Sequence, residues 1–329
     1  MRANPIAWFT RAFWVPVLVL AAAEVVIRLF FADGFTGRFD YGYLPAAGFF
    51  EEDGRVELRR SGGRRFYPQA FAVPKPAGRL RIFAVGDSVT RGQDLASAYP
   101  HQLEILLRQH GRDAETLNLG VTAYGATRKR IVALQALRYQ PDLIVLHASA
   151  ANEGYDERDW NRAESYRSWH PRNWFLKSYA LHRLYEARTD RLFWKYLPDE
   201  IRTLRSVRTP DAAFAAASRD PARLAEWNRR TRERTAATVR EIGAAGVPLV
   251  VITAAYHDAE HPRLEDDGLD AFVAALAGPR VAHVSTRAVF AGRSLEDNFN
   301  DSMHLTESGN RLLAQRVAEA CERLLAAEP

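Results

Sequence analysis

The sequence is poor in two residue types that often define a site. Cys321 is the only cysteine among 329 residues, so no disulfide can form within the chain. It falls in an apolar stripe near the C-terminus, where a packing role is expected. Lysine and arginine together number 45, yet only four of these residues are lysine: Lys75, Lys129, Lys177 and Lys195.

Motifs for nucleotide binding are missing as well. Neither a Gly-x-Gly-x-x-Gly motif nor a phosphate loop follows the first expected strand, so no cofactor is expected. The net charge is +5, but the arginines are scattered rather than gathered in one stripe, which argues against nucleic acid as a partner. With 47% hydrophobic and 26% charged residues, the composition is that of an ordinary globular protein. The oligomeric state is left open.

An apolar run near the N-terminus allows three interpretations. Residues 13–31 have the length that crosses a bilayer, about 17–25 residues. The run is interrupted by Glu24 and Arg28, which lie four apart on one helical face and can pair. We favour a membrane anchor, with the early arginines on the cytoplasmic side and the rest of a bacterial chain in the periplasm. A signal peptide removed at residue 23 would instead give a secreted or periplasmic protein, and a buried amphipathic helix is the third interpretation.

The remaining chain divides at a break in composition. Residues 32–78 are rich in glycine, aromatic residues and arginine, show no sustained period, and are expected to be a linker or an irregular N-terminal wrap. The stretch 74–78, with two prolines and a glycine, ends this segment. Residues 79–329 are expected to form the main domain.

In the main domain, short apolar runs alternate with helical patterns. Strands are expected at 80–85, 115–119, 143–146, 248–253 and 280–285, and helices at 100–109, 126–137, 222–245 and 307–327. Such alternation is typical of βαβ units in a parallel sheet with right-handed crossovers. The site of such a sheet lies beyond the carboxyl ends of its strands.

One stretch interrupts the alternation, at about residues 154–221. Five of the seven tryptophans lie between Trp160 and Trp227. A structureless loop of this length is uncommon, so a helical cap is expected. Its tryptophans could stack on sugars, grip acyl chains, or form the cap's own core.

Candidate catalytic residues follow the expected strands. Ser88 comes just after the first strand, where a helix is expected to begin, so its hydroxyl can face the cleft near backbone N–H groups that stabilise an anion. Gly120 follows the second strand and can offer its N–H to the same anion. Asn152 follows the third strand and can offer its side-chain amide. Each also has an ordinary structural explanation, as a helix cap, a turn glycine and a loop cap.

Asp301 and His304 complete the set before the last helix. The carboxylate three residues earlier can hold the His304 ring in one tautomer, which leaves the other ring nitrogen free to take a proton from Ser88. A lone Asp-x-x-His pattern is common by chance, but here all the elements occur in the right order along the chain. No Gly-x-Ser-x-Gly motif surrounds Ser88, which argues against the ordinary α/β-hydrolase fold.

On these residues the sequence resembles the SGNH hydrolases, also called GDSL esterases and lipases. The matching blocks are Gly86-Asp87-Ser88, Gly120, residues 150–153 with Asn152, and residues 301–304. The likeness covers about residues 68–153 and 235–325, and is strongest to bacterial members with an N-terminal membrane segment, which share the lead-in at 75–82. Ala150 and Glu153 depart from the family's Gly-x-Asn-Asp block.

The resemblance implies a flavodoxin-like three-layer α/β/α fold with a central parallel sheet of about five strands. It implies a serine hydrolase with Ser88, Asp301 and His304 as the catalytic residues. The oxyanion hole would consist of the Ser88 and Gly120 backbones and the Asn152 amide. The expected reaction hydrolyses or transfers an O-acyl group, short or acetyl, on an envelope glycan or a small ester. A polysaccharide O-acetyltransferase and a non-catalytic protein that binds a glycan or a partner are the alternatives.

One further pattern could suggest a metal site. His257 and His261 lie four apart, a spacing at which two histidines on a helix can share a metal ion. They follow an expected strand and precede Pro262, so a polar loop without metal is expected.

Overall fold

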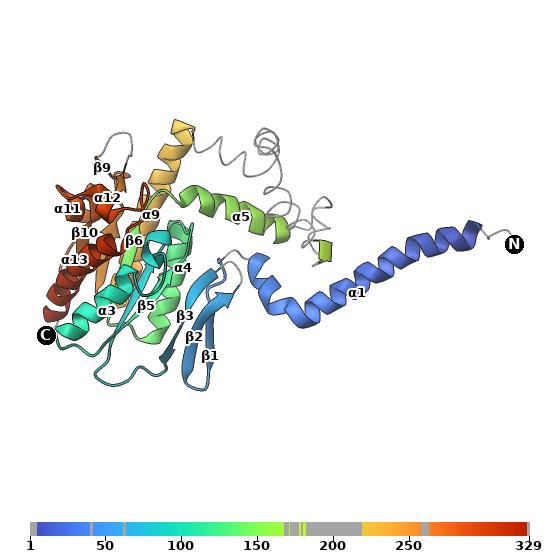
Figure 1. The fold of residues 1–329 in the computed structure, drawn as a ribbon, viewed down its shortest axis with the longest axis horizontal. Coiled ribbons are helices and arrows are strands. Elements are labelled where there is room, and N and C mark those ends of the chain that lie inside the picture. Colours follow the sequence, from blue (N-terminus) through green and yellow to red (C-terminus); the bar gives the residue numbers. More distant parts are fainter. Residues whose placement is uncertain are drawn as a thin grey trace.

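The structure, a computed structural model, describes residues 5–39, 42–61, 64–167, 171, 178, 180–181, 219–257 and 263–327. A parallel sheet with helices on both faces forms the main body, and a smaller antiparallel sheet packs beside it (Figure 1).

Five parallel strands form the central sheet. In chain order they are β4 (Leu80–Gly86), β5 (Ala114–Gly120), β6 (Leu143–Ala148), β7 (Leu249–Thr253) and β10 (Val281–Ser285). Across the sheet the order is β10-β7-β6-β4-β5, which is the 2-1-3-4-5 order of flavodoxin-like folds. The expected three-layer fold is therefore confirmed, and every expected strand boundary lies within two residues of the observed one.

Two helices cover each face of this sheet. They are α3 (Tyr99–Gln109) and α13 (Glu307–Ala326) on one face, and α4 (Ala126–Ala136) and α9 (Pro221–Ala244) on the other. Along β4, Ile82 and Ala84 pack with the first pair of helices, while Phe83 and Val85 pack with the second. Successive side chains of a strand point to opposite faces, so a run without polar residues is what a sheet covered on both faces requires.

Short elements connect the layers. They are α2 (Ser88–Arg91), the 3-10 helix η1 (Leu137–Tyr139), α5 (Glu153–Arg167), β8 (Tyr256–His257), β9 (Leu264–Glu265), α10 (Asp270–Ala274), α11 (Thr286–Phe290) and α12 (Leu295–Asn298). Helix α5 begins the expected insertion. Most of residues 154–221, including Trp169 and Trp174, lie outside the described residues.

An antiparallel sheet occupies residues that we expected to be an irregular wrap. Its strands are β1 (Phe49–Glu52), β2 (Arg55–Ser61) and β3 (Arg64–Ala72). In β2 only Val56 and Leu58 alternate as buried apolar residues, which is too short a pattern to predict a strand. The fully buried Arg64 ties this sheet to the chain before it, because its guanidinium donates to the carbonyl oxygens of Gly42, Pro45 and Ala47.

A single long helix, α1 (Pro5–Phe39), extends away from the body toward the N-terminus (Figure 1). Inside its apolar run, the carboxylate of Glu24 accepts hydrogen bonds from Ser178 Oγ and the Ala180 N–H, both at 2.9 Å. The run is thus interrupted by a charged group with polar partners. Within the described ranges no helix is both apolar and long enough to span a membrane, so the expected anchor at residues 13–31 is not supported.

Candidate active site

The carboxyl ends of β4 and β6 frame the switch point of the sheet. From β4 the chain continues to β5 on one side, and then returns to β6 on the other. Ligands of doubly wound folds bind in the crevice outside the strand ends at this point. Ser88 follows β4 and Asn152 follows β6, so two of the candidate residues flank the crevice.

Ser88 is the first residue of α2, and its side chain is partly exposed. The helix begins there because the fully buried Asp87 caps it, accepting the Val89 N–H at 3.0 Å. The first N–H groups of a helix have no acceptor within the helix. The Ser88 N–H can therefore bind an anion beside its own hydroxyl.

Asp301 and His304 meet Ser88 from the loop before α13. Nε2 of His304 lies 2.8 Å from Ser88 Oγ, and Nδ1 lies 2.6 Å from Asp301 Oδ2. The other oxygen, Oδ1, accepts the N–H groups of Met303 and His304 at 2.9 and 2.8 Å. Because Nδ1 faces a carboxylate, it carries the ring proton, and Nε2 is left to accept the serine hydroxyl.

The charge of Asp301 is fixed by the same contacts. Burial acts to raise the pKa of Asp301, but the N–H groups of His304 and Met303 and the His304 ring favour the charged form, and hold this pKa below its usual range. The carboxylate is therefore ionised at neutral pH and can orient the imidazole.

Backbone hydrogen bonds tie down the loop that carries these residues. The Asn300 N–H donates to the His304 carbonyl at 2.8 Å, which closes the loop on itself. The His257 N–H in β8 donates to the Ser302 carbonyl at 2.6 Å, which fastens the loop to a neighbouring segment. The imidazole is thus held in place before any substrate arrives.

Asn152 lies in the loop after β6 and is buried, with 6% of its surface exposed. Its Nδ2 donates to Asp87 Oδ2 at 3.1 Å, so one amide N–H is used and the second remains for a substrate oxygen. Next along the chain, Asp156 of α5 accepts the N–H groups of Gly125 and Thr127 at 2.9 and 3.0 Å. A side chain of α5 thereby caps the N-terminus of α4, and the loop with Asn152 is fixed to the core.

Gly120 allows a close backbone approach at the end of β5. Its N–H donates to Asn118 Oδ1 at 2.9 Å. A Cβ at this position would lie 2.2 Å from the backbone nitrogen of Arg91, so only glycine lets α2 lie against the end of β5. The contribution of the Gly120 N–H to an oxyanion hole stays a prediction.

The loop after β5 contains a strained residue that the sequence did not reveal. Ala123 has a φ of +63°, a left-handed conformation that costs energy for any residue with a Cβ. Its carbonyl accepts a hydrogen bond from Nη2 of the buried Arg128 at 2.7 Å, which helps to hold this conformation. Strain of this kind is concentrated at functional sites. The backbone N–H groups of Thr122 and Ala123 are thus candidate anion donors besides Gly120.

A buried charged cluster lies behind Ser88. Asp87, Lys129 and His147 are at most 2% exposed. Nζ of Lys129 lies 2.7 Å from Asp87 Oδ2, and Nδ1 of His147 lies 3.2 Å from Oδ1. The sequence held one signal of this cluster. Lys129 precedes the buried Val132 and Ala133 of α4 by three and four residues, which places it on the buried face of the helix.

The remaining candidate residues of the sequence are His261 and Cys321. His261 lies in residues 258–262, which are outside the described residues. Within the ranges that the structure describes, no cluster of three His, Cys, Asp or Glu side chains could hold a metal ion. Cys321 is buried in the core, and burial raises the pKa of its thiol.

Comparison with known proteins finds likeness at the level of fold. No protein-family model and no curated protein matches the sequence. Among solved structures, an acetyl xylan esterase is 14% identical with a TM-score of 0.44, and the match covers 73% of this chain and 99% of that one. A GDSL-like lipase from Bacteroides thetaiotaomicron is 10% identical with a TM-score of 0.39, covering 74% and 88%. The SGNH-hydrolase family esterase AlinE4 is 16% identical with a TM-score of 0.38, covering 78% and 100%.

Two of these three structures are described as an SGNH-hydrolase family esterase and a GDSL-like lipase.

Proposed function

We propose that the protein is a serine esterase that cleaves an O-acyl ester through Ser88, His304 and Asp301. The observation that carries this proposal is the hydrogen-bonded series from Ser88 Oγ through the His304 ring to the Asp301 carboxylate. Nucleophile, base and orienting carboxylate stand in the order that acyl transfer needs. The His304 side chain is 37% exposed, so a substrate can reach the series from solvent.

The reaction follows from these positions. Ser88 Oγ attacks the acyl carbonyl while His304 Nε2 takes the hydroxyl proton, and Asp301 stabilises the imidazolium that forms. His304 then gives the proton to the leaving alkoxide, which departs as an alcohol. Water, activated by the same ring, attacks the acyl-enzyme and releases the carboxylic acid.

The tetrahedral anion needs donors beside Ser88. The Ser88 N–H and the second N–H of the Asn152 amide would be two of these donors. The third donor would come from Thr122 or Ala123, because the Gly120 N–H already has an acceptor. Losing one such donor typically lowers turnover by about 100–1000-fold.

The proposed substrate is a short acyl group, such as acetyl, on a glycan of the cell envelope or on a small alcohol. The exposed position of His304 and Asp301 supports a bulky alcohol part that extends into solvent while only the acyl carbonyl enters the site. If a sugar hydroxyl replaces water in the second step, the same residues catalyse O-acetyl transfer.

A fluorophosphonate probe tests the proposal directly. It should label the wild-type protein at Ser88 and fail to label Ser88→Ala, and the wild type should hydrolyse p-nitrophenyl acetate. The matched control is Ser302→Ala, which removes an exposed hydroxyl from the loop that carries Asp301 and His304, leaves the backbone bonds of that loop in place, and should label like the wild type. A folded wild type that neither labels nor turns over any ester would favour a non-catalytic binding protein.

The substrate and the acceptor need a second experiment. Initial rates on p-nitrophenyl esters of increasing length should fall beyond short chains, and acetate release from acetylated glycans should depend on Ser88. An acetylated sugar formed at the expense of free acetate, when an unacetylated oligosaccharide is added, would identify a transferase.

A further inference from the structure

Lys129 belongs to none of the catalytic roles proposed above, yet it is one of the most buried charged groups described. It is 2% exposed, and its ammonium lies 2.7 Å from Asp87 Oδ2. Removing two charges from water is costly, so a buried pair of this kind contributes little net stability compared with apolar residues of similar size. Its presence directly behind the nucleophile calls for another explanation.

The carboxylate that Lys129 contacts also holds the Asn152 amide. Lys129 Nζ and Asn152 Nδ2 both donate to Oδ2 of Asp87, at 2.7 and 3.1 Å. The other oxygen, Oδ1, accepts the Val89 N–H at 3.0 Å. Lysine, carboxylate and amide therefore form one connected series from α4 to the loop after β6.

The series keeps Asp87 negatively charged. Burial alone would raise the pKa of Asp87, but the charge of Lys129, the His147 ring 3.2 Å away and the hydrogen bond from Lys129 outweigh burial, and hold the pKa far below its usual range. A charged acceptor binds an amide N–H more tightly than a neutral one. An ionised Asp87 thus restricts the Asn152 amide to one orientation.

Little space for solvent lies beside the cluster. The cavity beside the cluster, lined in part by Lys129, His147 and Ser149, measures about 10 Å³. That is room for about one water molecule. With methionine in place of Lys129, the carboxylate would lose its nearest positive charge while a side chain of similar length still fills the space.

We propose that Lys129 is a positioning residue, which acts through Asp87 to aim the free N–H of Asn152 at the oxyanion. This rests on the proposed esterase function. Lys129 touches no reacting atom, and its contribution is realised only when the tetrahedral anion forms. Its loss should therefore lower kcat and leave KM nearly unchanged.

A double-mutant cycle on kcat tests this, with p-nitrophenyl acetate as the substrate and the full chain as the enzyme. Lys129→Met should lower kcat roughly 10–100-fold, somewhat less than the loss of a whole oxyanion donor. Asn152→Ala should lower it further. In the Asn152→Ala background, Lys129→Met should cost less than about threefold, because the amide that it positions is gone.

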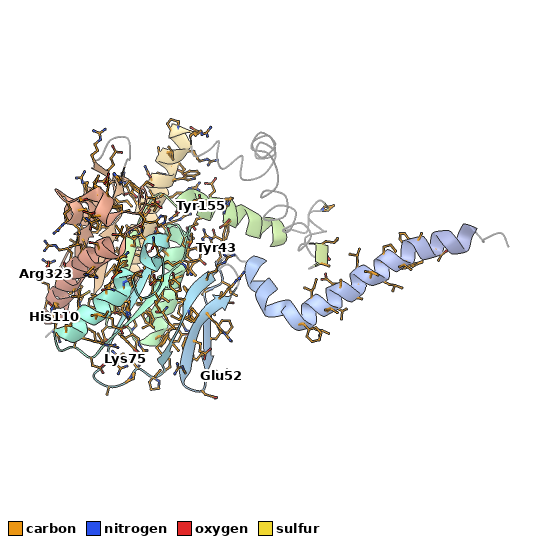
Figure 2. The ribbon with its side chains drawn as sticks, in the orientation of Figure 1. Tyr43, Glu52, Lys75, His110, Tyr155 and Arg323 are labelled. Carbon is orange, nitrogen blue, oxygen red and sulfur yellow. The ribbon has the colours of Figure 1, made fainter. Side chains whose placement is uncertain are left out.

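The control is Lys75→Met. Lys75 pairs with Asp142 at 2.5 Å at the opposite end of the sheet, and Figure 2 shows it far from Tyr155, which lies three residues after Asn152. This variant removes a lysine from an ion pair of similar length and should keep wild-type kcat and KM.

Each outcome of the cycle decides the proposal. An equal loss of kcat in both backgrounds would make Lys129 a structural residue only, and an unchanged kcat in Lys129→Met would remove the role altogether. If Lys129→Met does not fold, the cycle is repeated with Asp87→Asn/Lys129→Met, which removes both charges together. Most of its cost in kcat should again vanish without Asn152, and a cost that persists overturns the proposal. A wild type without esterase activity would instead mean that the proposed function fails.

Discussion

Ser88 and His304 are 216 positions apart in the chain, yet the Oγ of the first lies 2.8 Å from the Nε2 of the second. The serine is placed by the end of the first strand of the sheet, and the histidine by a loop that precedes the last helix. Their contact exists only when the whole sheet has formed, so it reports both the fold and the chemistry.

We expect unequal losses when the three proposed catalytic residues are changed one at a time. Ser88→Ala and His304→Ala should each lower kcat by about 10⁴-fold or more, because either change disables the whole unit. Asp301→Ala should leave more activity, since this carboxylate only orients and stabilises the ring. Steady-state kinetics of the folded variants checks this, and wild-type turnover in His304→Ala would contradict it.

Gly120→Ala should destabilise the protein, because its Cβ would meet the Arg91 backbone at 2.2 Å, where neither strand nor helix can give way. A loss of about 1–3 kcal/mol is expected for overpacking of this kind. Gly243→Ala is the matched control: a Cβ there meets nothing within 4 Å, and the residue lies inside α9. That change should stabilise the protein by about 0.5–1 kcal/mol. Urea unfolding of both variants measures the change in the free energy of unfolding. Changes of the same sign in the two variants would contradict the proposed packing role of Gly120.

Ala123 offers a test of the strained loop. Ala123→Gly removes the Cβ from a residue at φ +63°, so it should keep stability close to that of the wild type and preserve activity. Ala123→Val places a branched side chain in the same conformation and should lower kcat as the loop shifts. Equal kcat in the glycine and valine variants would show that the loop's backbone takes no part in turnover.

The stability of the protein should depend on pH through Asp267, which contacts the loop that carries Asn152. Its Oδ2 accepts the Ala150 N–H at 2.6 Å. Burial raises its pKa, although the hydrogen bonds from Ala150 and Tyr256 act in the opposite direction. A carboxyl whose pKa is higher in the folded than in the unfolded state loses stability as pH rises from the unfolded pKa to the folded one. Asp267→Asn keeps an acceptor for Ala150 and removes the charge. As pH rises through this range, the melting temperature of Asp267→Asn should therefore increase relative to that of the wild type.

The counterpart variant separates charge from hydrogen bonding. Asp267→Ala leaves the buried Ala150 N–H without its acceptor and should lower both melting temperature and kcat. A melting-temperature difference between wild type and Asp267→Asn that is the same at every pH would remove the titration from the explanation.

The sequence predicted the central sheet because its strands follow simple rules. Ile82 to Val85 is an apolar run that ends at Gly86, as expected for a strand buried on both faces. The same rules failed for the antiparallel sheet, since β2 and β3 contain several arginines and the buried Arg64 resembles a surface residue in sequence.

The candidate site was predictable only in part for a related reason. Ser88, Asp301 and His304 follow from residue type and order along the chain. Lys129 depends on a buried partner 42 positions away, and Ala123 on a backbone angle that alanine does not favour. Neither the buried partner of Lys129 nor the backbone angle of Ala123 follows from the residue type, so both become visible only in the three-dimensional structure.

The hydrogen bonds of Asp156 join the beginning of α5 to the beginning of α4. Its bonds to Gly125 and Thr127 come from the first turn of α5, directly after the loop that carries Asn152. The position of the Asn152 amide therefore depends on a carboxylate that touches no reacting atom, and a change at Asp156 would reach the site through the backbone of two helices.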